Sequence, residues 1–156
     1  MHLYPIATPP AGRANRRAPM STLTDRLRHD HADLRSVLER VRDLGIGTPQ
    51  GRAALLDARA LFVDHIQRED AEFYPALRNL ARIDPGARAH ADQFSAEMTK
   101  ISGDILAFFD KYRDGGSGLE FAIDFGRMHA MLHLRWHKEE SILYARHDRL
   151  AETAAA

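Results

Sequence analysis

Helix-breaking clusters divide the chain into four segments, and each segment carries apolar residues at helical spacing. The breakers are GIGTP (45–49), Asp84-Pro85-Gly86 and DGGSG (114–118). The apolar positions between them recur every three or four residues, which predicts amphipathic helices at roughly 22–44, 50–82, 86–113 and 119–150. No segment shows the alternation of a half-buried strand. Four such helices with short connections predict an all-α protein, an up-down-up-down four-helix bundle.

The two ends of the chain lack this periodicity. Residues 1–20 contain Pro, Gly and Arg but no continuous apolar run, so we expect a disordered N-terminal extension and no secretory signal. The bundle is then expected at 21–150, followed by a frayed tail at 151–156. Within the second helix, Pro75 lacks the N–H that a regular helix needs. We therefore expect the helix to kink there or to lose its regular form.

Composition narrows the function classes. Lys plus Arg number 22 and Asp plus Glu number 22, so the formal net charge is zero. No basic excess points to nucleic acid or an anionic membrane, and no apolar run approaches the ~18 residues that cross a bilayer. The chain has no cysteine, which excludes disulfides and thiolate ligands. Any metal must use nitrogen and oxygen ligands, and the expected location is the cytoplasm.

Several histidines and glutamates lie on or beside the apolar faces, where burial is unfavourable without a partner. His65 and Glu69 are four residues apart, so they lie about 40° apart on one helical face. Arg135 and Glu139 have the same spacing on the fourth helix. The candidate metal ligands from the four helices are His31, His65, Glu69, Glu97, His133, His137 and Glu139.

Depth along the bundle brings these candidates together. Counted from the first connection, His31 lies at the level of residue 63, close to His65. Counted from the second, Glu69 lies near Glu97, and the same level on the fourth helix falls at residues 133–139. REDAEFYPALRNLA (68–81) also resembles KEESILYARHDRLA (138–151), so the second and fourth helices should run parallel with similar faces. Four helices therefore bring metal-capable groups to one layer.

Each candidate also has an ordinary structural interpretation. A single histidine on an apolar face, such as His31, is commonly a core residue, and H-x3-E is common as an exposed helical pair. Glu97 could be a solvated edge residue. Arg135 and Glu139 could form a buried salt bridge as readily as Glu139 could bind metal. The histidines at i, i+4 and i+8 of the fourth helix form either a ladder of ligands or a pH-sensitive surface stripe. The convergence in depth favours the metal layer.

Three motifs resemble the hemerythrin-like, or HHE cation-binding, family. They are DHADLRSVL (30–38), H-x3-E-D-x2-FYP (65–75) and EE-x2-LY (139–144). The resemblance covers about 22–150 and implies a four-helix bundle around a non-haem iron site, usually of two irons. It places His31, His65 and Glu69 at ligand positions, with Glu69 as the bridging carboxylate. Where the family has histidines on the third and fourth helices, this chain has Glu97 and Arg135.

The resemblance implies an iron protein that binds or senses O2, or reacts with a peroxide or nitric oxide. The alternative is a metal-poor bundle that acts as an interaction or regulatory module and binds a protein partner, and Arg135 favours it. A peroxide-consuming enzyme would need an acid–base group, which His133 or His137 could supply. Asp70 or Glu72 are the expected hydrogen-bond partners of the ligand histidines.

Overall fold

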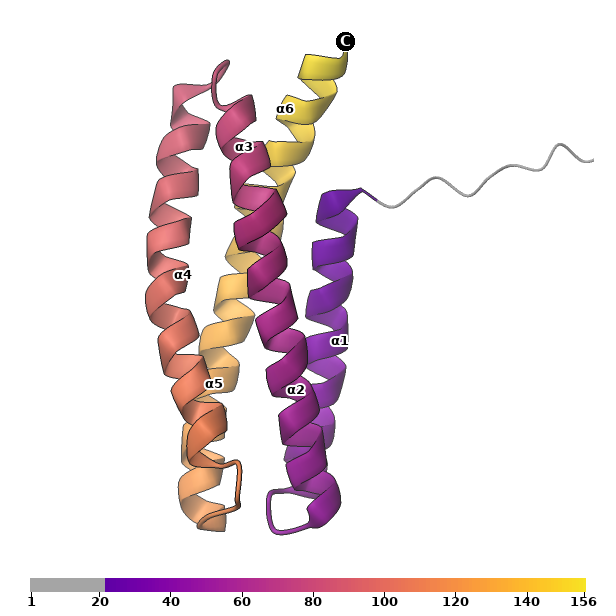
Figure 1. The fold of residues 1–156 in the computed structure, drawn as a ribbon, viewed down its shortest axis with the longest axis vertical. Coiled ribbons are helices and arrows are strands. Elements are labelled where there is room, and N and C mark those ends of the chain that lie inside the picture. The colour runs from indigo at the N-terminus through magenta and orange to yellow at the C-terminus, as the bar shows by residue number, and fades with distance from the viewer. Residues whose placement is uncertain (1–21) are drawn as a thin grey trace, which may run out of the picture.

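The computed structural model describes residues 22–156, and the disordered extension expected at 1–20 lies outside them. The elements are α1 (Leu23–Leu44), α2 (Pro49–Arg68), η1 (Glu69–Phe73), α3 (Tyr74–Leu80), α4 (Pro85–Lys111), α5 (Gly118–Lys138), η2 (Glu139–Tyr144) and α6 (Ala145–Ala155). The wide π-helical turns η1 and η2 each continue one helix into the next. The elements form four continuous arms, which are α1, then α2 with η1 and α3, then α4, and finally α5 with η2 and α6. Figure 1 shows these arms running alternately up and down. The described residues contain no strand, so the predicted all-α four-helix bundle is confirmed.

Capping chemistry sets where the helices begin and end. At the start of α1, the Thr22 hydroxyl accepts the Asp25 N–H, and the Asp25 carboxylate accepts the Thr22 N–H. Side-chain oxygens cap the other three arms as well, from Thr48, Asp84 and Ser117. Gly45 ends α1 with φ at 65°, a conformation that favours glycine. Gly51 must also be small, because a Cβ there would lie 1.6 Å from the Gly45 carbonyl oxygen.

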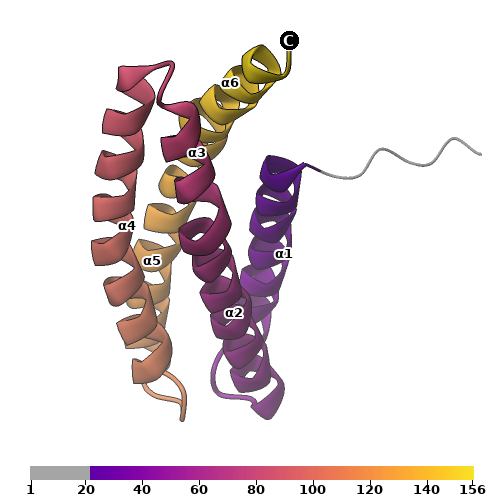
Figure 2. The same cartoon turned by 45° about the horizontal axis from the view of Figure 1, so that its top comes forward.

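The interruption expected at Pro75 takes the form of a π turn. In a regular α-helix the proline ring clashes with the carbonyl four residues earlier, and here that residue, Ala71, lies in the wide turn η1, which ends two residues before Pro75. The equivalent turn η2 contains no proline and was not expected. Figure 2 shows α6 leaning away from the line of α5 beyond this turn. Both π turns begin at a glutamate, Glu69 or Glu139, which ties them to the candidate site rather than to proline alone.

Two apolar clusters fill the bundle, and a polar layer lies between them. The cluster near the α1–α2 and α4–α5 connections includes Leu34, Phe62, Phe109, Leu132 and Trp136. The cluster toward the α3–α4 connection includes Leu27, Phe73, Leu77, Phe94 and Leu143. The layer between them contains the buried polar side chains His31, His65, Glu69, Arg135 and Glu139. Because burying an ionisable group is unfavourable by several kcal/mol unless it is paired, this layer is where a function is expected.

The last helix extends the bundle. α6 continues to Ala155, past the residue 150 at which the apolar pattern ends and the frayed tail was expected, in keeping with the high helix propensity of alanine. Asp148 joins α6 to α1: its carboxylate accepts hydrogen bonds from the Thr24 hydroxyl at 2.6 Å and from Arg28 Nη2 at 3.1 Å. In the part of the chain that the structure describes, no helix has the length and hydrophobicity to cross a membrane.

Asp148→Asn should destabilise the protein at neutral pH by about 1 kcal/mol, because it weakens charged hydrogen bonds at a partly exposed site. Burial alone would raise the pKa of Asp148, but the bonds from Thr24 and Arg28 outweigh it and lower the pKa. The stabilisation is therefore present above the ordinary pKa and is lost as the pH falls through the lowered one. Thermal unfolding at neutral and acidic pH checks this, with Asp114→Asn in the exposed loop as control. Equal stability of Asp148→Asn and wild type at neutral pH would contradict it.

Candidate metal centre

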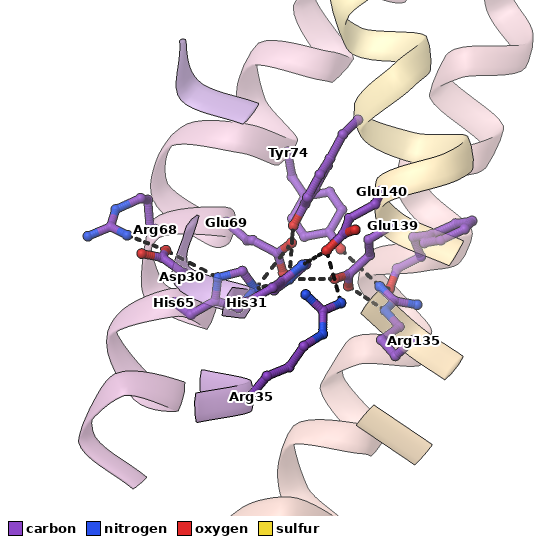
Figure 3. Close-up of polar contacts among 12 residues, drawn as sticks. Asp30, His31, Arg35, His65, Arg68, Glu69, Tyr74, Arg135, Glu139 and Glu140 are labelled. Carbon is purple, nitrogen blue, oxygen red and sulfur yellow. Dashed lines mark hydrogen bonds and ion pairs between the residues drawn. The ribbon is translucent and has the colours of Figure 1, made fainter. Parts of the chain in front are cut away.

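Two buried histidines point the same ring nitrogen at each other. His31 Nε2 from α1 and His65 Nε2 from α2 are 3.1 Å apart. Each ring contacts a carboxylate through its other nitrogen: His31 Nδ1 lies 2.7 Å from Glu140, and His65 Nδ1 lies 3.3 Å from Asp30 (Figure 3). Because an ionised carboxylate only accepts, each Nδ1 carries a proton, and both Nε2 atoms are left to face the centre. Two Nε2 atoms at this distance call for a proton or a cation between them.

Two buried glutamates lie beside the two histidines, and the four residues form one half of the polar layer, the histidine half. Glu139 Oε2 lies 3.2 Å from His31 Nε2, and Glu69 Oε1 lies 3.7 Å from His65 Nε2. Neither Glu69 Oε2 nor Glu139 Oε2 has a well-oriented hydrogen bond among the residues that the structure describes. Ligand atoms of His31, His65 and Glu139 lie within 4.8 Å of one another. Buried unpartnered carboxylate oxygens are unfavourable, and a metal ion beside the two Nε2 atoms would satisfy them. The residues therefore fit a cation.

The two glutamates differ in protonation. Burial raises the pKa of Glu69 well above its usual range, and the negative charge of Glu139 raises it further. Burial acts in the same direction on Glu139, but its contact with His31 and the charge of Arg135 outweigh it and lower the pKa of Glu139. Burial also lowers the pKa of His65, against the opposing effect of Asp30. In the metal-free layer these shifts favour the protonated form of Glu69, the charged form of Glu139 and the neutral form of His65.

The other half of the layer is occupied by the guanidinium of Arg135 from α5. Its Nε donates to Glu139 Oε1 at 2.5 Å, and its Nη1 donates to Glu97 Oε2 at 3.2 Å. Its Nη2 donates to the Tyr74 hydroxyl at 3.1 Å and to the Phe94 carbonyl at 2.8 Å. Burial alone would lower the pKa of Arg135, but the charge of Glu139 raises it, so the guanidinium stays protonated. This half is satisfied without a metal.

The π turns bring two tyrosines into the layer. Tyr74 and Tyr144 each lie five residues after the glutamate that begins the turn. Five residues of α-helix would place them about 140° from that glutamate, whereas a π turn bonds residue i to i+5 and returns them toward its face. The Tyr144 hydroxyl donates to Glu69 Oε1 at 2.6 Å. Burial raises the pKa of Tyr144, so the phenol keeps this proton.

The structure brings four of the seven sequence-predicted ligands together: His31, His65, Glu69 and Glu139 (Figure 3). Glu97 lies at the rim, with its side chain 42% exposed, and contacts Arg135 rather than the histidines. Its other carboxylate oxygen accepts a hydrogen bond from Gln93 Nε2, on the same helix, at 3.0 Å.

His133 and His137 do not reach the centre. On an α-helix they lie about 120° and 160° from the face of Glu139, whereas Arg135 lies about 40° from it. His137 is exposed. The His133 ring packs between His129 and Trp136, with ring centroids 4.1 Å and 5.3 Å away. α5 is not rotated in the way that metal binding by His133 and His137 would require. Arg135 occupies the inward position instead.

The carboxylate partners of the histidines differ from those expected on the second helix. Glu72 is paired with Arg26 at the surface, at 2.8 Å, and Asp70 is exposed. The partners are Asp30 and Glu140, which are the direct neighbours of two candidate ligands in the chain. Both partners are present in the sequence motifs, as the Asp before His31 and the Glu after Glu139. A pattern along a single helix does not identify them, because each partner lies on a different helix from its histidine.

The comparison with protein families agrees with this geometry. A family model described as the hemerythrin HHE cation binding domain matches residues 1–77 and 22–147. The chain therefore belongs to the hemerythrin HHE cation-binding family, and the resemblance seen in its motifs is confirmed. Neither a curated protein nor a solved structure matches the chain.

Proposed function

We propose that the protein is a non-haem iron protein that binds its metal through His31, His65, Glu69 and Glu139. The observation that carries the proposal is the pair of Nε2 atoms, 3.1 Å apart and each held by a carboxylate on Nδ1. Two histidines with a carboxylate form a donor set typical of non-haem ferrous iron. When bound, the iron would supply a site at which O2, nitric oxide or a peroxide binds.

The residues around this site have separate parts in the proposal. Asp30 and Glu140 fix the tautomers of the two rings and orient both Nε2 atoms. Tyr144 holds Glu69 by a hydrogen bond to Oε1, which leaves Oε2 for a cation. The apolar clusters above and below keep bulk water out of the layer. Neither His133 nor His137 lies where it could move a proton at this centre, so we propose binding or sensing rather than peroxide turnover.

Metal analysis of protein produced with added iron tests the proposal. We expect iron to co-purify, and nitric oxide added to the ferrous protein to change its absorption and electron paramagnetic resonance spectra. Adding Fe(II) to metal-free protein should raise the melting temperature, because a ligand at a hundred times its Kd stabilises by about 2.7 kcal/mol. A protein that takes up no Fe(II), Mn(II) or Zn(II) and whose melting temperature does not move would sink the proposal.

One observation favours the alternative, a metal-poor interaction or regulatory module. Arg135 already neutralises Glu139 without any metal, by a hydrogen bond of 2.5 Å. Under that alternative the fold needs no metal ion, and a protein partner binds its surface. The metal analysis above separates the two functions. The cytoplasmic location stays a prediction.

A further inference from the structure

We infer that Arg135 takes the place of a second cation, so that the layer accepts one metal ion and one guanidinium. The inference rests on the proposed metal binding and adds to it the number of ions and the residue that limits it. Three features of the molecule support it: the internal repeat, the contacts of Glu139 and the surroundings of the guanidinium.

The two arms that carry the paired glutamates of the layer are related by the internal repeat. The similarity between residues 68–81 and 138–151 sets an offset of 70, which matches Glu69 to Glu139 and Tyr74 to Tyr144. Both glutamates begin a π turn. The same offset matches His65, four residues before its glutamate, to Arg135. The two arms thus present the same pattern, except that one has an imidazole where the other has a guanidinium.

The tyrosine contacts connect the two arms across the bundle. Tyr144 donates to Glu69 in the histidine half, and Tyr74 accepts from Arg135 in the arginine half. Each tyrosine therefore reaches the polar pair of the opposite arm. The arginine half therefore occupies the position that the repeat relates to the metal half, but α4 supplies the Phe94 carbonyl and Glu97 there, whereas α1 supplies His31 to the metal half.

Glu139 shares its two oxygens between the halves. Oε1 accepts from Arg135 Nε at 2.5 Å, while Oε2 lies 3.2 Å from His31 Nε2 and has no well-oriented hydrogen bond. A carboxylate that offers one oxygen to each of two positions suits two cations. Here the guanidinium is one of them, and the other oxygen is left for a metal ion.

The guanidinium closes its half to a second ion. Its donors are engaged by Glu139, Glu97, Tyr74 and the Phe94 carbonyl, and its carbon lies 4.6 Å from the centroid of the Phe94 ring. Any metal ion there would have to displace a buried cation and would be repelled by it. Arg135 is therefore the residue that sets the metal count.

Metal stoichiometry tests the inference. Metal-free protein is loaded with Mn(II), freed of excess ion and analysed for metal per chain, and the electron paramagnetic resonance spectrum distinguishes isolated ions from a coupled pair. Wild type should hold one isolated Mn(II). Arg135→His should double the stoichiometry and give a coupled pair, because it removes the charge and restores an H-x3-E pair with Glu139. Arg135→Lys, the matched control that keeps the charge, should hold one.

The outcomes separate this inference from the proposed function. Wild type that binds no metal overturns both, whereas wild type that binds two ions overturns the inference alone. Circular dichroism first establishes that each variant folds, and Arg135→Gln replaces Arg135→His if the latter does not. The glutamine variant should take up a second Mn(II) at higher metal concentration. A neutral variant that folds and still holds a single ion at every concentration also overturns the inference.

Discussion

His65→Ala is expected to abolish metal binding, with an affinity loss of more than about a hundredfold. Residues that merely orient a ligand histidine cost 10- to 100-fold when changed, so removing the ligand itself should cost more. The alanine removes an Nε2 atom that lies 3.1 Å from its counterpart on His31. His31→Ala should have the same effect, because neither imidazole can hold the ion alone. Calorimetric titration of the metal-free proteins with Fe(II) or Mn(II) measures the change.

Two other histidines serve as matched controls for this expectation. His29 lies on the same helix as His31, but its side chain is 77% exposed and lies 3.6 Å from the carboxylate of Asp33. His137 lies exposed on α5. Alanine at either position should leave the metal affinity within about twofold of wild type, as ordinary surface changes do. A loss at His29→Ala as large as that at His65→Ala would show that the inward face of α1 has been assigned wrongly.

The histidine half of the layer could be predicted because regular helices obey fixed geometry. Between Leu23 and Arg68 the chain is α-helical apart from one short connection, so 100° per residue and 1.5 Å per residue describe it well. On that basis the sequence predicts that His31, His65 and Glu69 point inward at one level. The structure finds all three buried and adjacent.

The remainder could not be predicted because it depends on irregular turns and on contacts between helices. A constant rotation per residue fails across η1 and η2, so Tyr74 and Tyr144 were not expected in the layer. The partners Asp30 and Glu140 come from neighbouring helices, which no single-helix pattern identifies. For Glu139 the sequence left a salt bridge and metal ligation as alternatives. The structure shows the salt bridge on one oxygen and leaves the other oxygen available.

Glutamine at the two buried glutamates should have opposite effects on the stability of the metal-free protein. Glu139 is charged and is the closest partner of the buried Arg135, at 2.5 Å. Glu139→Gln removes the charge that balances this guanidinium, and breaking a buried pair from one side costs about 3 kcal/mol or more. Glu139→Gln should therefore lower the free energy of unfolding by about 3 kcal/mol at neutral pH. It should also weaken metal binding, because an anionic ligand is lost.

Glu69→Gln should instead leave the metal-free protein as stable as wild type or make it more stable. Burial, followed by the charge of Glu139, raises the pKa of Glu69, so the folded protein keeps this proton to a higher pH than the unfolded chain does. Stability is then reduced as the pH rises above the ordinary pKa of a glutamate, and glutamine removes that loss while still accepting the Tyr144 hydrogen bond. Urea unfolding with a chelator present measures both variants. The stability advantage of Glu69→Gln should vanish in acid, because Glu69 of wild type is then protonated in both the folded and the unfolded protein. The metal affinity of Glu69→Gln should fall, as that of Glu139→Gln does. Equal destabilisation by the two glutamines at neutral pH would mean that Glu69 is charged in the metal-free protein, and that the layer holds its two carboxylates in the same state.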